Sequence, residues 1–268
     1  MNSINSESHS TPVISVQRGA VQWITINRPE RRNAINEQVT MGIAEGIHTA
    51  SQNKDIRAIV LTGAGNKAFC AGGDLRPELE GTPFNTDHST IQHFVVDLFK
   101  VVEDCSLPII ARVNGHALAG GLGLLCMCDL AVTSDTALFG TPESKIGLFP
   151  ATILTYMLRI LPRRKLMEMC ITGESFSAHD ALEMGLVNYV ASPSELDEKL
   201  DWLLSRIVNK SPTGIRLGKA GLHAMQDMPM REALEYTQLL LPYMSKTEDA
   251  AEGMAAFQEK RAPIWTGK

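Results

Sequence analysis

Apolar runs and segments of helical periodicity alternate along the first half of the chain. The runs 13–16 and 21–26 flank a turn at Gly19, which is typical of a β-hairpin. Asn36 is expected to cap an amphipathic helix that extends to about Gln52. The chain therefore begins its regular structure with a strand pair followed by a helix.

The strand and helix signals then repeat, with glycines between them. Strands are expected over 58–61, 109–113 and 130–133, and helices over about 91–105 and 120–127. Residues 78–89 are rich in Gly, Pro, Thr and Asp, which predicts a loop. This order favours an α/β fold with a mainly parallel sheet that is covered on both faces.

From Pro150 onward the pattern predicts helices only. Ser177 and Asp180 have capping-box spacing, and Gly185 can end that short helix. Ser194 is expected to open a longer helix with leucines on one face. Three more helices are expected around 212–226, 230–245 and 247–260. We therefore expect a disordered segment 1–12, an α/β core 13–195 and a helical C-terminal region 196–268.

Composition narrows the class of protein. The net charge of −5 argues against a general polyanion binder, so no nucleic-acid partner is expected. The start of the chain lacks the features of a signal peptide, and no segment is apolar enough for a membrane span. The five cysteines are scattered and have no metal-ligand or redox spacing, as buried free thiols would. We expect a cytoplasmic protein with no membrane partner and no metal.

Two glycine-rich turns, 71–74 and 119–121, each follow an apolar run and precede a helix-like segment. Glycines in such turns let backbone N–H groups approach a ligand, and two N–H groups aimed at one point stabilise an oxyanion. Tight packing of strand against helix is the alternative explanation. Neither turn has a dinucleotide or P-loop pattern.

Several further motifs share the order and spacing of one family. They are Ile26-Asn-Arg-Pro-Glu30 with Asn33-Ala-Ile-Asn36, Lys67-Ala-Phe-Cys-Ala-Gly-Gly-Asp-Leu75, Val113-Asn-Gly-His-Ala-Leu-Ala-Gly-Gly121 with Cys128-Asp129, Phe139-Gly-Thr-Pro-Glu143 with Ile146-Gly-Leu148, Leu182-Glu-Met-Gly-Leu-Val-Asn188, and Glu252-Gly-Met-Ala-Ala-Phe-Gln-Glu-Lys-Arg261. Over about residues 13–262 the chain resembles the crotonase family, also called the enoyl-CoA hydratase/isomerase family. The resemblance implies a spiral of ββα units with a helical C-terminal trimerisation region. It also implies an acyl-CoA substrate, no separate cofactor, and a homotrimer or a hexamer made of two trimers.

The resemblance also assigns site residues. Gly73 and Gly120 would supply the oxyanion hole, and Glu143 would transfer the proton. Contacts to the CoA ester would come from Arg32, Ala34, Ala71, Gly72, Asp74, Leu75, Arg76, Gly121, Phe257 and Lys260. Among these, the resemblance places Arg76 near the CoA phosphates. It places Arg32 and Ala34 along the path of the adenine and the pantetheine. Phe257 and Lys260 would contact the nucleotide end of CoA. The alternative explanation for Arg76 is a solvated charge on a loop.

Glu143 follows Pro142 and precedes the apolar stretch 146–150. A carboxyl group in such surroundings is partly desolvated, which raises its pKa toward a value useful for acid–base catalysis. A glutamate after proline also occurs as an ordinary charge at a helix N-terminus.

One position departs from the resemblance. Hydratases of the family carry a second glutamate where this chain has Gly123. A single carboxylate supports isomerisation of an enoyl-CoA, and hydrolysis, decarboxylation, C–C cleavage or non-catalytic acyl-CoA binding stay open. His88 and His93 are weaker candidates for supplying the missing group, and His116 is expected to be structural.

Overall fold

The computed structural model describes residues 11–76 and 93–268. The expected loop 78–89, His88 and most of the segment 1–12 lie outside the described residues. The first elements agree with the sequence pattern: β1 (Val13–Arg18) and β2 (Val21–Ile26) form the antiparallel hairpin. The Asn36 side chain accepts a hydrogen bond from the Val39 N–H at 3.0 Å and caps α1 (Glu37–Gln52).

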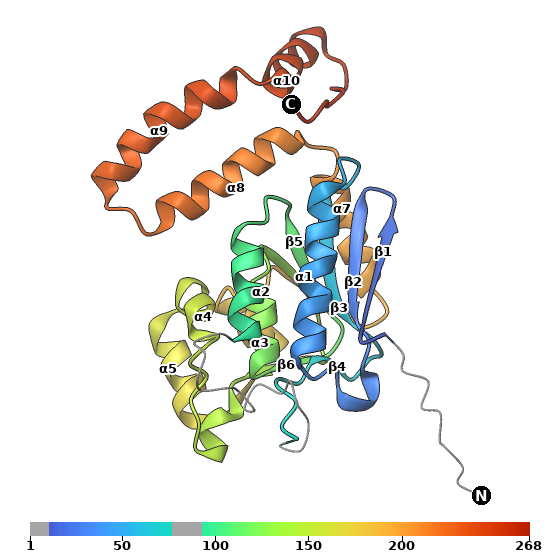
Figure 1. Cartoon of the computed structure of the whole chain (residues 1–268), viewed down its shortest axis with the longest axis vertical. Helices are drawn as coiled ribbons and strands as arrows, with labels where there is room; N and C mark the ends of the chain where they lie inside the picture. The colour runs from blue at the N-terminus through green and yellow to red at the C-terminus, as the bar shows by residue number, and fades with distance from the viewer. Residues whose placement is uncertain (1–10, 77–92) are drawn as a thin grey trace, which may run out of the picture.

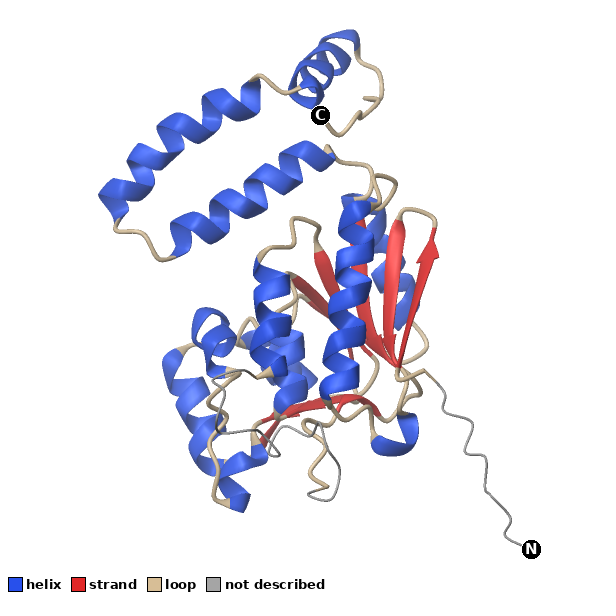
Figure 2. Cartoon of the chain, viewed as in Figure 1, coloured by secondary structure: helices blue, strands red, loops and turns tan. Residues whose placement is uncertain are grey.

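A six-stranded sheet has the order β1-β2-β3-β5-β7-β10 and is parallel apart from the first pair. Its further strands are β3 (Ala58–Gly63), β5 (Ile109–Val113), β7 (Leu130–Ser134) and β10 (Tyr189–Ala191). A second sheet joins β4 (Ala68–Cys70), β6 (His116–Leu118), β8 (Leu138–Gly140) and β9 (Ser175–Ser177) in that order. Figure 2 shows these short strands crossing near one end of the long strands.

Each long strand from β3 onward leads into a short strand and then into a helix. The pairs β3–β4, β5–β6 and β7–β8 are followed by α2 (Phe94–Glu103), α3 (Gly120–Cys126) and the 3-10 helix η2 (Pro142–Ile146). This repetition is the expected spiral of ββα units. It brings three strand ends, and the turns that follow them, to the same edge of the second sheet.

The apolar strands are buried on both faces. Ile59 and Leu61 of β3 face a core that includes α1 and α2, whereas Ala58 and Val60 face α7 (Leu196–Ile207). Alternate residues of a strand point to opposite faces of the sheet, so the residues on both faces of β3 must be apolar. The sequence of β3 is therefore a continuous apolar run.

Between residues 150 and 195 the structure differs from the helices-only expectation. The helices α4 (Leu154–Ile160), α5 (Arg163–Thr172) and α6 (Ala178–Glu183) are present, and the capping box of Ser177 is confirmed. The three-residue strands β9 and β10 interrupt them, so the expectation is wrong there. The next helix begins at Leu196 with Glu195 as its N-cap, rather than directly after Ser194.

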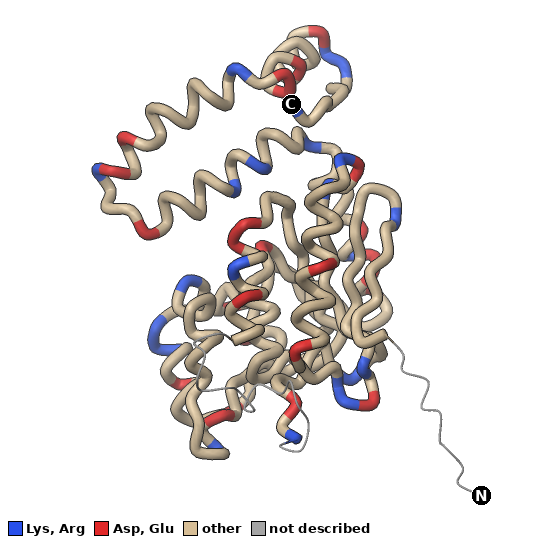
Figure 3. The backbone as a smooth tube through the Cα atoms, in the orientation of Figure 1, with Lys and Arg blue, Asp and Glu red and all other residues tan. Residues whose placement is uncertain are grey.

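The last three helices, α8 (Pro212–Gln226), α9 (Met230–Ser245) and α10 (Glu248–Glu259), form an arm that extends beyond the core (Figure 1). The Lys219 ammonium joins the arm to the core by an ion pair of 2.6 Å with Asp129. α9 has no buried residue, and charges are absent from its middle (Figure 3). Its exposed apolar residues include Leu234, Leu239 and Leu241. No helix among the described residues is long and apolar enough to cross a membrane.

Candidate active site

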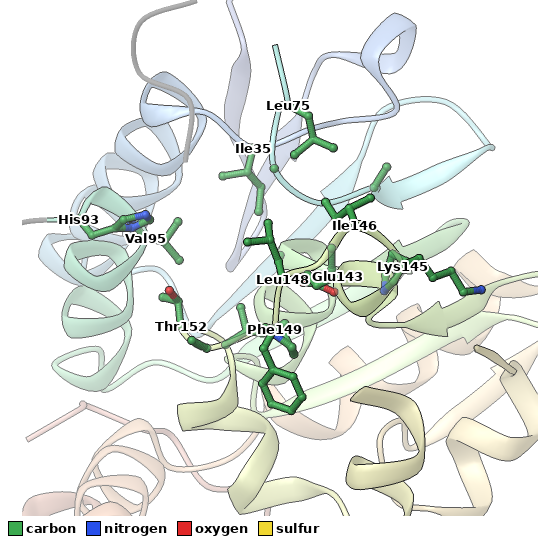
Figure 4. A pocket seen from close by; sticks show the side chains of 18 residues that line it. Ile35, Leu75, His93, Val95, Glu143, Lys145, Ile146, Leu148, Phe149 and Thr152 are labelled. Atoms are coloured by element: carbon green, nitrogen blue, oxygen red, sulfur yellow. The ribbon is translucent and has the colours of Figure 1, made fainter. Parts of the chain in front are cut away.

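A cavity of about 350 Å³ opens where β4, β6 and β8 end. Both glycine turns and Glu143 line it, together with an apolar wall (Figure 4). The lining residues are Ile35, Ala71, Gly73, Leu75, His93, Val95, Ala119, Gly120, Pro142, Glu143, Lys145, Ile146, Leu148, Phe149, Pro150, Ala151, Thr152 and Ile153. The fold thus gathers five of the residues assigned from the sequence around one space: Ala71, Gly73, Leu75, Gly120 and Glu143.

The two turns pack so closely that side chains would not fit between them. A Cβ atom on Gly72, whose φ is +103°, would lie 2.7 Å from the Ala119 Cβ. A Cβ on Gly121 would lie 2.1 Å from the Cys70 carbonyl oxygen. Gly72 and Gly121 do not line the cavity, so their contribution is to let the turns approach each other.

The close approach leaves two backbone donors side by side. A Cβ on Gly120 would lie 3.7 Å from the Gly73 nitrogen. Neither N–H group donates a hydrogen bond to any described residue, although the N–H of Ala119 donates to the Gly140 carbonyl. Ala119 has φ 49° and ψ −128°, a sparsely populated backbone conformation that persists only where its surroundings enforce it. Two unpaired N–H groups in one cavity wall can stabilise negative charge on a carbonyl oxygen.

Glu143 lies on η2 directly after Pro142. Its Oε2 atom is buried and has no hydrogen-bond partner among the described residues. Burial raises the pKa of this carboxyl group, and a hydrogen bond from its own backbone N–H opposes that rise only in part. A carboxylate with a raised pKa is a stronger base than an exposed one, as proton abstraction requires.

The raised pKa has a consequence for stability. A carboxyl group whose pKa is higher in the folded than in the unfolded state favours folding at low pH, and this contribution is lost as pH rises through the folded-state pKa. We therefore expect Glu143→Gln, which does not titrate, to gain stability relative to the wild type as pH rises above about 4, the ordinary pKa of a glutamate. Urea unfolding of both proteins at equal concentration measures the difference. A difference that is independent of pH would contradict the raised pKa.

Ile153 packs directly against Gly123, the position at which the family resemblance implies a second glutamate. A Cβ atom on Gly123, in α3, would lie 2.2 Å from the Ile153 Cγ2 and 3.5 Å from the Phe99 ring. Ile153 itself lines the cavity. Glu143 is consequently the only carboxylate among the described lining residues.

Of the three histidines considered as site residues, His93 and His116 lie among the described residues, and they have different environments. His93 lines the cavity from the start of α2, and its Nδ1 accepts a hydrogen bond from the Val95 N–H at 3.3 Å (Figure 4). The Nδ1 of His116 accepts the Leu138 N–H at 3.1 Å, as a structural histidine would. His116 borders a separate polar hollow of about 380 Å³, where Arg32 also lies.

The residues assigned to the CoA path do not line the cavity, apart from Ala71 and Leu75. The Arg76 guanidinium donates two hydrogen bonds to Asp74, at 2.9 and 2.7 Å. Hydrogen bonding with Arg76, and with Arg28 in addition, holds the pKa of the buried Asp74 carboxyl well below its usual range. Asp74 is therefore held as the counter-ion of two arginines.

Phe257 and Lys260 lie at the end of α10, on the arm and far from the β4 and β6 turns of the same chain (Figure 1). Phe257 is 85% exposed. Sequence reasoning missed Ile153 and Arg28. Ile153 lies in none of the family motifs. Arg28 lies in the motif 26–30, but no contact was assigned to it.

Comparisons with known proteins identify the family. A family model described as enoyl-CoA hydratase/isomerase matches residues 17–268. The chain is 34% identical to an (E)-benzylidenesuccinyl-CoA hydratase from Thauera aromatica, with 96% of this chain and 99% of the relative covered. It is 35% identical to a carnitinyl-CoA dehydratase from Salmonella typhi, with 94% and 97% covered.

Solved structures give the same result. A crystal structure of an enoyl-CoA hydratase from Mycobacterium smegmatis superposes with a TM-score of 0.89 at 33% identity, and 96% of this chain and 99% of that chain are covered. A human enoyl coenzyme A hydratase domain-containing protein 3 gives a TM-score of 0.88 at 29% identity, covering 95% and 100%. The chain is an enzyme with the crotonase fold, and it belongs to the enoyl-CoA hydratase/isomerase family.

Proposed function

We propose that this enzyme isomerises enoyl-CoA thioesters and uses Glu143 as its sole proton carrier. The observation that carries the proposal is the composition of the cavity. It combines two N–H groups, at Gly73 and Gly120, that have no partner among the described residues with one carboxylate whose Oε2 atom is buried. Ile153 leaves no room for a side chain at Gly123. The relatives named as a hydratase and a dehydratase support acyl-CoA chemistry in general.

In the proposed reaction the substrate is a 3-enoyl-CoA. Its thioester carbonyl oxygen accepts hydrogen bonds from the N–H groups of Gly73 and Gly120. These bonds lower the pKa of the C–H group next to the thioester. The Glu143 carboxylate removes that proton, and the resulting dienolate places its negative charge on the same oxygen. The protonated Glu143 then returns a proton to the carbon at the far end of the conjugated system. The product is a 2-enoyl-CoA, and no water enters.

Hydration would require a further group to activate water while Glu143 handles the carbon-bound proton. Lys145 also lines the cavity, but its ammonium pairs with Glu174 at 3.0 Å and cannot act as a base in that state. Most side chains that line the cavity are apolar, among them Ile146, Leu148 and Ile153, and the polar ones besides Glu143 and Lys145 are His93 and Thr152. This composition favours the movement of a proton within the substrate over the addition of water.

A photometric comparison tests the proposal. A 3-enoyl-CoA and a 2-enoyl-CoA of equal chain length are offered to the same enzyme preparation. Isomerisation of the first is expected to exceed hydration of the second by about 10²-fold or more, the usual contribution of one acid–base group. Hydration at an equal or higher rate would contradict the proposal and favour a hydratase.

We further propose that the arm joins copies of the chain into a homotrimer or a pair of trimers. The exposed apolar residues of α9 and α10 support this, since such surfaces are unfavourable in water. Phe257 and Lys260 would then reach the CoA nucleotide bound by a neighbouring copy. Light scattering on the purified protein is expected to give three or six chains, and a stable monomer would contradict the arrangement.

A further inference from the structure

Backbone hydrogen bonds join the first glycine turn, residues 71–74, to residues 32–35, which we call the supporting segment. The Ala71 N–H donates to the Arg32 carbonyl at 3.0 Å, the Ile35 N–H to the Gly72 carbonyl at 2.7 Å, and the Asp74 N–H to the Ile35 carbonyl at 2.8 Å. These three bonds hold the backbone on both sides of Gly73 and leave its own N–H without a partner among the described residues. The position of that N–H therefore depends on the position of the supporting segment.

The supporting segment has an unusual backbone conformation. Arg32 and Asn33 both have positive φ, 51° and 57°, which non-glycine residues adopt only where contacts enforce it. The buried Asn33 side chain supplies such contacts. Its Nδ2 donates to the carbonyls of Ala64 and Ala68 at 3.0 and 2.8 Å, and its Oδ1 accepts the Arg28 N–H at 3.1 Å.

Arg28 is the side chain that links the supporting segment to the turn. One of its terminal nitrogens donates to the Ala34 carbonyl at 2.6 Å, and the other donates to the Asp74 carboxylate at 2.9 Å. Both side chains are largely buried, at 13% and 6% exposure. In such surroundings a charge-assisted hydrogen bond is stronger and more directional than at the surface.

We infer that Arg28 and Asp74 are positioning residues that hold the Gly73 N–H against the substrate carbonyl. The inference rests on the proposed oxyanion site. Neither side chain lines the cavity, so both act through the backbone between Ala34 and Asp74. A displacement of about 1 Å in a catalytic donor can lower a rate by about 10²-fold, so a bridge outside the cavity is able to control turnover.

Arg28→Met tests the inference. The variant loses both side-chain bonds, but Asp74 keeps Arg76 as a partner, so no unpaired carboxylate is left in the interior. We expect kcat to fall by about 10- to 100-fold with KM changed less than threefold. The matched control is Arg112→Met. Arg112 is 18% exposed and forms an ion pair with Asp197, away from the cavity, so this variant is expected to keep its activity.

A spectroscopic readout separates positioning from a general effect on stability. The infrared stretch of a ¹³C-labelled thioester carbonyl is expected to move to lower frequency on binding to the wild type, because N–H donors polarise the bond. Arg28→Met is expected to lose most of this shift while it still binds the ester. Arg28→Lys keeps the positive charge but replaces the planar guanidinium group with a single ammonium nitrogen. An intermediate shift of the carbonyl frequency is expected for this variant.

The outcomes are distinguishable. A full carbonyl shift and a normal kcat in Arg28→Met would overturn the positioning role and leave the oxyanion site intact. No shift in the wild type would overturn the oxyanion site itself, and the inference with it. If Arg28→Met does not fold, Arg28→Lys decides: a wild-type shift and kcat overturn the inference, and reduced values support it.

Discussion

Replacing Glu143 with glutamine is expected to lower kcat for a 3-enoyl-CoA by about 10³-fold or more, because no other carboxylate among the described residues lines the cavity. The amide has nearly the same shape as the carboxyl group, so the walls of the cavity are preserved. It has no basic oxygen that can accept the carbon-bound proton. Steady-state kinetics with a photometric assay measures the loss.

Glu174→Gln is the matched control for this variant. Glu174 is an exposed glutamate whose partner is Lys145, and it does not line the cavity. The activity of Glu174→Gln is expected to stay within about twofold of the wild type, since exposed ion pairs contribute little to stability. Calorimetry is expected to show unchanged binding of the acyl-CoA to Glu143→Gln. Activity within tenfold of the wild type in Glu143→Gln would contradict its role as the proton carrier.

Introducing a glutamate at position 123 is expected to have the second large effect. In Gly123→Glu the new side chain meets Ile153 at distances that real Cβ atoms do not adopt, and a carboxyl group enters an apolar region beside Phe99. Overpacking and burial of a polar group together are expected to lower the free energy of unfolding by about 3 kcal/mol or more. Urea denaturation measures this loss.

The double variant Gly123→Glu with Ile153→Ala is expected to recover much of that stability, because the truncated side chain makes room for the carboxyl group. It also places two carboxylates at the cavity. Hydration of a 2-enoyl-CoA is expected to rise at least about tenfold over the wild type. Ile153→Ala alone is the control and is expected to show no such gain. A Gly123→Glu protein as stable as the wild type would show that Ile153 does not hold this space.

Much of the fold follows from local sequence signals. The hairpin around Gly19, the Asn36 cap and the capping box of Ser177 all depend on contacts within a few residues, and all three are confirmed. The strands β4, β6, β8, β9 and β10 were not predicted, because each has only three residues. A period of two cannot be recognised over so short a run, and these strands exist because distant segments pair with them.

In the candidate site, too, the residues in local motifs were predicted and the contacts between distant residues were not. The two glycine turns and Glu143 stand in motifs, and the structure brings them to one cavity. The contact of Gly123 with Ile153 and the ion pair of Arg28 with Asp74 join residues 30 and 46 positions apart. No local pattern indicates such contacts. Under the proposed mechanism, the first contact excludes a second carboxylate from the cavity and the second contact holds the first turn, so the proposed preference for isomerisation depends on the contact of Gly123 with Ile153.

Proton exchange in D₂O tests the central claim most directly, namely that the two turns stabilise an enolate while Glu143 moves the proton. NMR spectroscopy follows the signal of the hydrogen on the carbon next to the thioester of an acyl-CoA incubated with the enzyme. The wild type is expected to replace this hydrogen with deuterium, and Glu143→Gln is expected to leave it in place. No exchange with the wild type, or equal exchange with Glu143→Gln, would contradict the mechanism.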